Sequence, residues 1–316
     1  MSLVASVHQQ HVERVERRLE TAVAAQPGVV ADAGARTLGA GGKRLRPLLV
    51  SLCAPQQARG RELLVTAGCA VELVHMATLV HDDVLDATPL RRGRPTIWHS
   101  DGRQRATATG DYLFARAFAE LATTGDIEAV TILADACLAL ARGEILQRAQ
   151  SGDPSTTVEA YRERCTLKTG RLFSAAAMLG ARFGGLDRAQ GDALGRFAEA
   201  LGLAFQIADD VLDCDGNPDT TGKPLGTDLL DGTITLPLIL AAGRDPAVER
   251  VIAAGATPDD VLPTLARVVA SGAVADARAE ARRLAAVALD ELESVTAAVD
   301  HAALREAVQL AVERSS

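Results

Sequence analysis

Residues 63–86 read LLVTAGCAVELVHMATLVHDDVLD, an apolar run that passes into three aspartates. Apolar residues fill nearly every position, so a helix formed here needs neighbours on all of its sides. Glu72 and His75 interrupt the run, and they argue for the buried helix of a soluble protein rather than a membrane span. The stretch therefore predicts a core helix in an all-α protein.

Helical spacing recurs on both sides of this stretch, and no run alternates as a β-strand would. Clusters of glycine, proline and aspartate separate the predicted helices. These helices span residues 8–25, 29–38, 45–53, 60–86, 104–123, 127–149, 157–183, 189–213, 236–242, 246–253, 258–271, 274–296 and 301–314. No change of composition marks a linker, so we expect a single large helical-bundle domain over residues 1–316.

Composition narrows the classes of function. The chain has 316 residues, of which 48% are hydrophobic, and a formal net charge of −8. These values argue against disorder and against a nucleic-acid binder. The five cysteines include no CxxC pair, which favours free thiols over a disulfide framework or a zinc site. The first twenty residues hold no apolar run, so we expect no signal peptide and a cytoplasmic protein.

The sequence DDVLD occurs twice, at residues 82–86 and 209–213, each time at the end of a long apolar helix. Carboxylates four residues apart share a helix face, and the helix macrodipole disfavours anions at this end, so cations are needed. Oxygen ligands of this kind suit Mg²⁺, which bridges to substrate phosphates. The predicted ligands are Asp82, Asp83, Asp86, Asp209, Asp210 and Asp213. The alternatives are a solvated acidic helix end and a calcium module, although no Ca²⁺ loop is present.

Cations gather close to these aspartates in sequence. Only Lys43, Lys168 and Lys223 are lysines among 33 basic residues, and each lies within two residues of a glycine, in a context typical of phosphate binding. Arg91 and Arg92 follow the first aspartate motif, and a guanidinium group binds phosphate oxygens in a bidentate way. Any one of these residues could instead be an ordinary surface cation.

Two polar residues lie one or two helical turns N-terminal to the aspartates. His75 precedes Asp82 by seven residues and Gln206 precedes Asp209 by three, so each shares a helix face with its motif. A buried neutral amide could orient a substrate or stabilise a cation. The alternatives are a hydrogen-bonded core histidine and an amide that only packs between helices.

These motifs together resemble the trans-prenyl diphosphate synthases, or polyprenyl synthetases, and in particular their medium- and long-chain members. The resemblance covers residues 41–237. It rests on Gly41-Gly42-Lys43-Arg44, His75, the first aspartate motif with Arg91-Arg92, Gly110-Asp111-Tyr112, Gly143-Glu144 with Gln147, Lys168-Thr169, Phe205-Gln206 with the second aspartate motif, Gly222-Lys223, and Gly226-Thr227-Asp228.

The resemblance implies a fold of about a dozen helices around a central cavity, usually in a homodimer. It implies Mg²⁺-dependent prenyltransferase activity, in which isopentenyl diphosphate condenses head-to-tail with an allylic diphosphate in successive steps. About three Mg²⁺ ions per active site would be held by the aspartates. No transmembrane segment is implied, only transient membrane contact for product release.

The resemblance also implies the roles of individual residues. Isopentenyl diphosphate would be bound by Lys43, Arg46, His75 and Arg92, and the allylic diphosphate by Arg91, Lys168 and Lys223. The main-chain carbonyls near Lys168 and Thr169, with the amide of Gln206, would stabilise the carbocation. Thr233 stands where the family has a lysine facing the allylic diphosphate.

Product length depends on the helix before the first aspartate motif, along which the growing tail runs. Ala77 and Thr78 lie one turn below Asp82, and Val74 lies one turn further down. None is a bulky aromatic that would close the pocket, so these floor residues predict products longer than C20. The alternatives are a C20 or C15 synthase and, from another class, a partner subunit that sets product length. A terpene cyclase is disfavoured because it needs no isopentenyl site.

Overall fold

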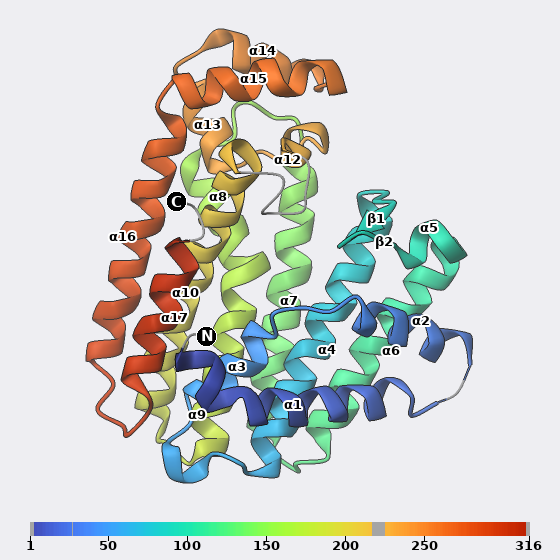
Figure 1. Cartoon of the computed structure of the whole chain (residues 1–316), viewed down its shortest axis with the longest axis vertical. Helices are drawn as coiled ribbons and strands as arrows, with labels where there is room; N and C mark the ends of the chain where they lie inside the picture. Colours follow the sequence, from blue (N-terminus) through green and yellow to red (C-terminus); the bar gives the residue numbers. More distant parts are fainter. Residues whose placement is uncertain (1–2, 27, 217–224, 314–316) are drawn as a thin grey trace. The chain divides into compact units, whose positions relative to one another are not determined.

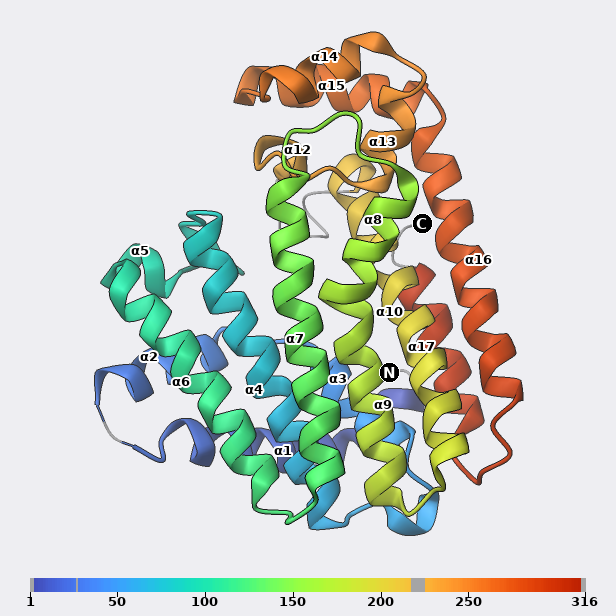
Figure 2. The same cartoon turned by 180° about the vertical axis from the view of Figure 1, so that it is seen from behind.

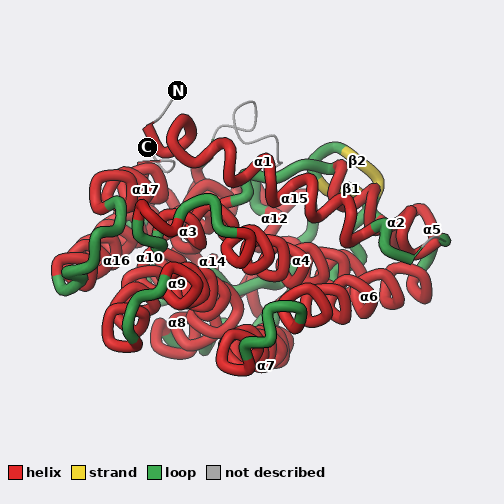
Figure 3. The backbone as a smooth tube through the Cα atoms, turned by 90° about the horizontal axis from the view of Figure 1, so that it is seen from below, coloured by secondary structure: helices red, strands yellow, loops and turns green. Residues whose placement is uncertain are grey.

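The computed structural model describes residues 3–26, 28–216 and 225–313, and it confirms the all-α prediction. Within these ranges the only strands are those of one short hairpin, β1 (Leu90–Arg91) and β2 (Arg94–Pro95), drawn in yellow in Figure 3. The chain divides into two compact units. Unit 1 comprises Met1–Cys137, Ala175–Gly195 and Val295–Leu304, and unit 2 comprises Leu138–Ser174, Arg196–Ser294 and Arg305–Ser316. The single domain over residues 1–316 and its central cavity stay predictions.

Unit 1 is built around α4 (Glu62–Leu85), the helix of the opening stretch (Figure 1). The other elements of this unit are α1 (Leu3–Val23), α2 (Val29–Gly39), α3 (Leu45–Leu52), a 3₁₀ turn (Gln56–Ala58), the hairpin, α5 (Ile97–Asp101) and α6 (Arg103–Ala122). Helices α1, α3 and α6 pack on α4. By length and composition α4 could cross a membrane, but 78% of its most apolar segment is buried, as expected for a core helix.

Four helices contribute residues to both units: α7 (Ile127–Ala149), α9 (Arg171–Gly184), α10 (Arg188–Asp215) and α17 (His301–Glu313). Within unit 1, α9 lies directly against α3. Gly180 permits this approach, because a Cβ at that position would collide with the carbonyl oxygen of Val50. The close contact explains why a glycine stands in the interior of a helix, where it costs stability.

Unit 2 contains α8 (Val158–Cys165), a π-helical turn (Thr166–Gly170), α12 (Thr227–Leu230), α13 (Leu236–Ala242), α14 (Pro246–Ala254), α15 (Pro258–Ala270) and α16 (Ala273–Glu293). Helix α13 packs on α14, α15, α16 and α8. The predicted helix over residues 157–183 is confirmed in extent, but a π turn that was not predicted divides it into α8 and α9. There the backbone N–H of Arg171 donates to the carbonyl of Thr166, five residues earlier.

The remaining helix predictions agree with the structure to within a few residues at each end, and those for α7 and α13 match at both ends. The five cysteines are free, as predicted. The hairpin, α5 and α12 were not predicted, because each has six residues or fewer and lies in or beside a predicted break.

Candidate active site

The hairpin after α4 places two of the predicted phosphate-binding arginines. Leu90 pairs with Pro95 and Arg91 with Arg94, so the loop consists of Arg92 and Gly93 alone. Both loop residues have positive φ, 53° and 73°, as a two-residue hairpin turn of the favoured hand requires. A non-glycine residue in this conformation is strained, and such strain is concentrated at functional sites.

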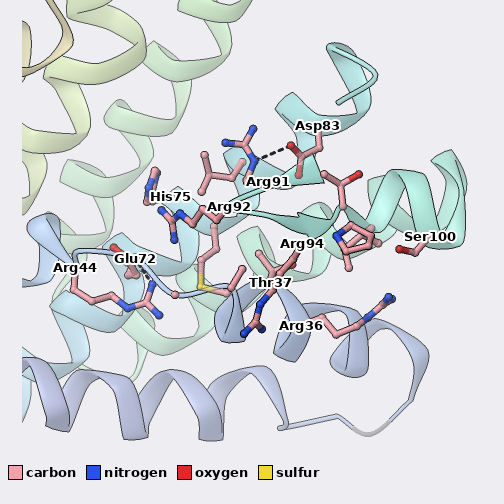
Figure 4. A pocket seen from close by; sticks show the side chains of 17 residues that line it. Arg36, Thr37, Arg44, Glu72, His75, Asp83, Arg91, Arg92, Arg94 and Ser100 are labelled. Carbon is pink, nitrogen blue, oxygen red and sulfur yellow. Dashed lines mark hydrogen bonds and ion pairs between the residues drawn. The ribbon is translucent and has the colours of Figure 1, made fainter. Parts of the chain in front are cut away.

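Unit 1 has a cavity of about 260 Å³ lined by α2, the turn before α3, α4, the hairpin and α5 (Figure 4). The basic residues of its wall are Arg36, Arg44, His75, Arg91, Arg92 and Arg94, and its acidic residues are Glu72 and Asp83. Arginine side chains therefore dominate the wall. A cavity of this composition is suited to a multiply charged anion such as a diphosphate.

Arg44 and Glu72 form a buried ion pair at this wall, with 2.9 Å between Nη1 and Oε1 and side chains 6% and 4% exposed. Arg44 has φ of 49° and precedes the first residue of α3. Its Nη1 and the Nη1 of Arg92 both lie over Gly42, where a Cβ would stand 2.9 and 3.0 Å from them. Gly42 therefore lets two guanidinium groups come close to the main chain.

The electrostatics of the cavity favour anions without a charged histidine. Burial lowers the pKa of His75 well below its usual value, and Arg46 and Arg92 lower it further. His75 is thus neutral at pH 7 and can offer only a hydrogen bond. Burial lowers the pKa of Arg46 to about 10, against the attraction of Glu72, so Arg46 stays charged. Lys43 is exposed on the turn before Arg44.

The first aspartate motif lies at the C-terminal end of α4. Asp83 is buried and accepts a hydrogen bond from Nε of Arg91 at 2.7 Å. Burial raises the pKa of Asp83, while Arg91 acts in the opposite direction. His81, just before the motif, packs so closely on α6 that a Cβ on Gly110 would overlap its ring. Gly110, to which the sequence assigned no role, therefore has a structural one, since it lets the His81 ring of α4 pack against α6.

The second aspartate motif lies at the C-terminal end of α10, in unit 2. The two carboxylate oxygens of Asp213 accept the backbone N–H groups of Thr227 and Asp228, each at 3.1 Å. Asp213 therefore fastens α12 to the end of α10. Thr233 follows in the next loop, where its N–H donates to the carbonyl of Asp228 at 2.8 Å.

Asp210 joins Tyr161 to Gln206 in a chain of hydrogen bonds. Its Oδ2 accepts from the hydroxyl of Tyr161 at 2.5 Å and its Oδ1 accepts from Nε2 of Gln206 at 2.9 Å. The Oε1 of Gln206 in turn accepts from the hydroxyl of Thr169 at 2.9 Å. Burial raises the pKa of Asp210, and burial followed by the charge of Asp210 raises that of Tyr161.

The π turn follows α8 and carries Lys168 close to α7. Figure 2 shows α7 beside α8. Lys168 Nζ donates to Oε2 of Glu144 at 2.6 Å and to Oε1 of Gln147 at 3.2 Å. Gly143 makes this possible, because a Cβ there would stand 2.8 Å from the backbone nitrogen of Lys168. A π turn alters the pattern of main-chain hydrogen bonds, which is common at functional sites.

The structure thus places the predicted residues in two groups. Unit 1 contains the first aspartate motif and the predicted residues Lys43, Arg46, Val74, His75, Ala77, Thr78, Arg91 and Arg92. Of these, His75, Arg91 and Arg92 line its cavity together with Asp83, whereas Lys43 and Arg46 do not. Unit 2 brings together Lys168, Thr169 and Gln206 with the second motif. Val74 and Ala77 are fully buried, and the hydroxyl of Thr78 donates to the carbonyl of His75. Lys223 lies outside the described residues.

The sequence pattern assigned no site role to four residues that hold these groups: Arg44, Glu72, Glu144 and Tyr161. Glu72 had a signal, since it is a lone acid in an apolar helix, and a buried acid needs a cation. Tyr161 precedes Lys168 by seven residues, two turns along a regular helix, but nothing in the sequence pairs it with Asp210.

The carboxylates of the aspartate motifs suit Mg²⁺, which takes some of its ligands from water and substrate, better than a metal ion whose ligands all come from the protein. Among the described residues, no three His, Cys, Asp or Glu side chains form a group that could hold a metal ion. Mg²⁺ usually keeps waters and needs only one or two protein carboxylates besides substrate phosphates, and each aspartate motif offers such carboxylates.

Comparison with known proteins gives consistent matches. The family model for polyprenyl synthetase matches residues 28–262. The chain is 40% identical over 247 residues to heptaprenyl diphosphate synthase component 2 of Geobacillus stearothermophilus, covering 78% of this chain and 77% of the relative. It is 37% identical over 287 residues to nonaprenyl diphosphate synthase of Mycobacterium tuberculosis, covering 89% and 85%. A polyprenyl synthase of Caulobacter crescentus, solved with calcium and isoprenyl diphosphate, has a TM-score of 0.92 and 34% identity, covering 99% and 97%.

Proposed function

The chain belongs to the polyprenyl synthetase family, and we propose that it is a trans-polyprenyl diphosphate synthase. It condenses isopentenyl diphosphate with an allylic diphosphate, head-to-tail and repeatedly, to give products longer than C20. Relatives named as heptaprenyl, nonaprenyl and octaprenyl diphosphate synthases support this length class. The observation that carries the proposal is the arginine-lined cavity of unit 1, beside an aspartate motif.

The cavity of unit 1 binds the diphosphate of isopentenyl diphosphate. From its wall Arg92 supplies charge and neutral His75 donates a hydrogen bond. Arg46 and Lys43, which do not line the cavity, would complete the cationic set. Arg44 and Glu72 hold the wall, since their buried ion pair fixes one of the two guanidinium groups over Gly42. This arrangement leaves Arg92 as the group best placed to turn toward an anion.

The allylic diphosphate is bound by Arg91, Lys168 and Lys223, together with Mg²⁺ held by the aspartates. Bound Mg²⁺ stabilises the negative charge of a departing diphosphate. Asp82, Asp83, Asp86 and Asp209 would be the main ligands, with Asp210 and Asp213 in support. Asp83, Asp210 and Asp213 also accept hydrogen bonds from protein groups, which fixes the orientation of these carboxylates.

Two of the diphosphate-binding cations are paired with carboxylates, Arg91 with Asp83 and Lys168 with Glu144. Water reaches both partners of the Lys168–Glu144 pair, so a diphosphate can compete for Lys168 at low cost, whereas competition for Arg91 costs more because Asp83 is only 7% exposed. At the reacting end, the carbonyls of the π turn and the amide oxygen of Gln206 face the developing positive charge of the allylic group. No protein nucleophile takes part.

Product length is set on the buried side of α4. Ala77 and Thr78 lie one turn below Asp82, and Val74 lies one turn further. All three side chains are small, and the hydroxyl of Thr78 is satisfied within the helix. These residues therefore leave room for a long tail.

The protein acts as a cytoplasmic homodimer, with transient membrane contact when product leaves. Leu138 and Ile145 on α7 are 65% and 68% exposed, and seven residues separate them, so they share one helix face. Large apolar side chains exposed together mark an interaction surface. A second copy of the chain covers this face.

The test is product analysis of the purified chain. Labelled isopentenyl diphosphate is supplied with C5, C10, C15 or C20 allylic primers and Mg²⁺, and products are measured by mass spectrometry. The chain alone should make products longer than C20. No condensation with any primer would refute the proposal, and condensation only after a second protein is added would make this chain one subunit of a heteromeric synthase.

A matched pair of variants ties the activity to the site. Asp82→Ala should lower kcat by about 10²–10³ or more, since it removes electrostatic stabilisation of the leaving group. Asp276→Ala removes a 57%-exposed carboxylate that pairs with Arg244, and it should leave kcat unchanged. Equal turnover of the two folded variants would contradict the assignment of the metal site.

A further inference from the structure

Tyr161 is the largest side chain in unit 2 that the proposed mechanism does not use. It lies on α8, it is fully buried, and its hydroxyl donates to Oδ2 of Asp210 at 2.5 Å. Asp210 is itself only 4% exposed. A buried carboxylate needs donors for its lone pairs, so this hydroxyl has a defined task.

The second oxygen of Asp210 fixes the orientation of Gln206. A carboxylate can only accept hydrogen bonds, so the NH₂ group of the amide must face Oδ1, and it does so at 2.9 Å. The amide oxygen then points the other way, where it accepts from the hydroxyl of Thr169 at 2.9 Å. Asp210 thereby decides which end of the amide faces Thr169.

The ring of Tyr161 is also fixed. The guanidinium carbon of Arg164 lies 5.3 Å from the ring centroid, a cation–π distance. Arg164 is 3% exposed and is tied to Oε1 of Gln150 at 2.9 Å and to the carbonyl of Ile234 at 2.6 Å. Arg164 therefore fixes the ring of Tyr161, and with it the position of the hydroxyl.

We propose that Tyr161 is a positioning residue, which acts through Asp210 to hold the amide of Gln206 and the hydroxyl of Thr169 at the reacting end of the allylic substrate. The proposal rests on the proposed function. Without the hydroxyl, Oδ2 of Asp210 loses its donor inside the protein, and the carboxylate turns to find another. The amide of Gln206 then loses its fixed partner and samples the reversed orientation.

The experiment compares two hydroxyl deletions in the full chain, which has only two tyrosines. Tyr161→Phe keeps the ring and removes the hydroxyl. Tyr112→Phe makes the same change in unit 1, where the hydroxyl donates to the carbonyl of Val23 at 3.0 Å. The readouts are the single-turnover rate of the first condensation, KM for each diphosphate and the circular dichroism spectrum.

Tyr161→Phe should fold normally, keep both KM values within about twofold and lose about 10-fold or more in the single-turnover rate, because misplacement of a reacting-end group mainly affects the chemical step. Tyr112→Phe should match the wild type. A wild-type rate for Tyr161→Phe would overturn the proposal, and so would a variant that does not fold, which would assign the hydroxyl to the fold alone.

A double-mutant cycle tests whether the effect passes through Gln206. In a Gln206→Ala background, Tyr161→Phe should cost less than about threefold, because the group that it positions is already gone. The same loss in both backgrounds would refute positioning. A wild-type chain that forms no prenyl product would refute the proposed function instead, so the two failures are distinguishable.

Discussion

Replacement of Gly143 by alanine is the sharpest test of how helix packing sets the site. Gly143 lies on α7, and a Cβ there would stand 2.8 Å from the backbone nitrogen of Lys168 and 3.1 Å from two Cβ atoms, those of Leu167 and Lys168. Ordinary contacts begin at 3.4 Å, so the π turn must move by about 0.6 Å. Backbone cannot swing aside as the end of a side chain can.

The expected change in stability is small because two effects oppose each other. Alanine in place of glycine inside a helix gains about 1 kcal/mol. Overpacking against backbone costs about 1–3 kcal/mol. The net loss in free energy of unfolding is therefore about 0–2 kcal/mol, which leaves the protein folded.

The expected change in turnover is larger. A displacement of 1 Å at a catalytic group can cost about 10²-fold in rate, so a shift of about 0.6 Å at Lys168 should lower kcat by about 10-fold. The assay is the rate of the first condensation, alongside urea unfolding followed by circular dichroism. Wild-type turnover in a folded Gly143→Ala variant would refute the reasoning.

Gly191→Ala is the matched control. Gly191 also lies inside a helix, α10, but the nearest atom to its Cβ position is the Cβ of Ala181 at 3.7 Å. The substitution should therefore raise the free energy of unfolding by about 0.5–1 kcal/mol and leave kcat unchanged. Equal effects at the two glycines would show that backbone contact is not the cause.

Three further substitutions have defined outcomes. Glu72→Gln should lower the free energy of unfolding by about 1–3 kcal/mol in urea denaturation, because the buried Arg44 loses its charged partner at 2.9 Å and keeps only Glu16, at 3.4 Å, and the carbonyl of Leu38; Glu62→Gln, at a 63%-exposed glutamate, should change it by about 0–1 kcal/mol, and equal losses would contradict the argument. Thr233→Lys should tighten binding of an allylic diphosphate by about 1–2 kcal/mol in calorimetry, and no change would mean that another cation already covers that phosphate. Ala77→Phe should shorten the product toward C15 or C20 by mass spectrometry, whereas an unchanged product length would show that the tail takes another path.

Local sequence predicted the helices well where the apolar period was long. The ends of α7 and α13 matched the prediction because turn residues or a proline stand beside them. The π turn could not be predicted in the same way. Its residues, Thr166–Gly170, suit an ordinary helix, and the turn lies where Gly143 on another helix brings α7 against Lys168. Tertiary contact overrides local propensity at such a place.

The sequence predicted which residue types gather at the site but not which of them pair. Asp83 and Arg91 are eight residues apart, and their contact depends on a hairpin whose strands are two residues long. Tyr161 and Asp210 are separated by 49 residues and meet only because α8 lies against α10. Partner choice of this kind depends on tertiary packing, which periodicity does not record.

Burial separates the ion pairs of the site into two kinds. Side chains in the Arg44–Glu72 pair are 6% and 4% exposed, so separating its charges would leave the Glu72 carboxylate buried without its ion pair, at a cost of about 3–5 kcal/mol. In the Lys168–Glu144 pair the exposures are 23% and 20%, so water reaches both partners, and such a pair contributes about 0–1 kcal/mol. The Arg91–Asp83 pair is of mixed kind, since Arg91 is 30% exposed and Asp83 only 7%. A diphosphate, which offers more charge and more oxygens than one carboxylate, can therefore take Lys168 from Glu144 at low cost, whereas taking Arg91 would leave Asp83 buried without its cation. Of these two cations, both of which we propose for the allylic diphosphate, Lys168 is thus the more readily exchanged.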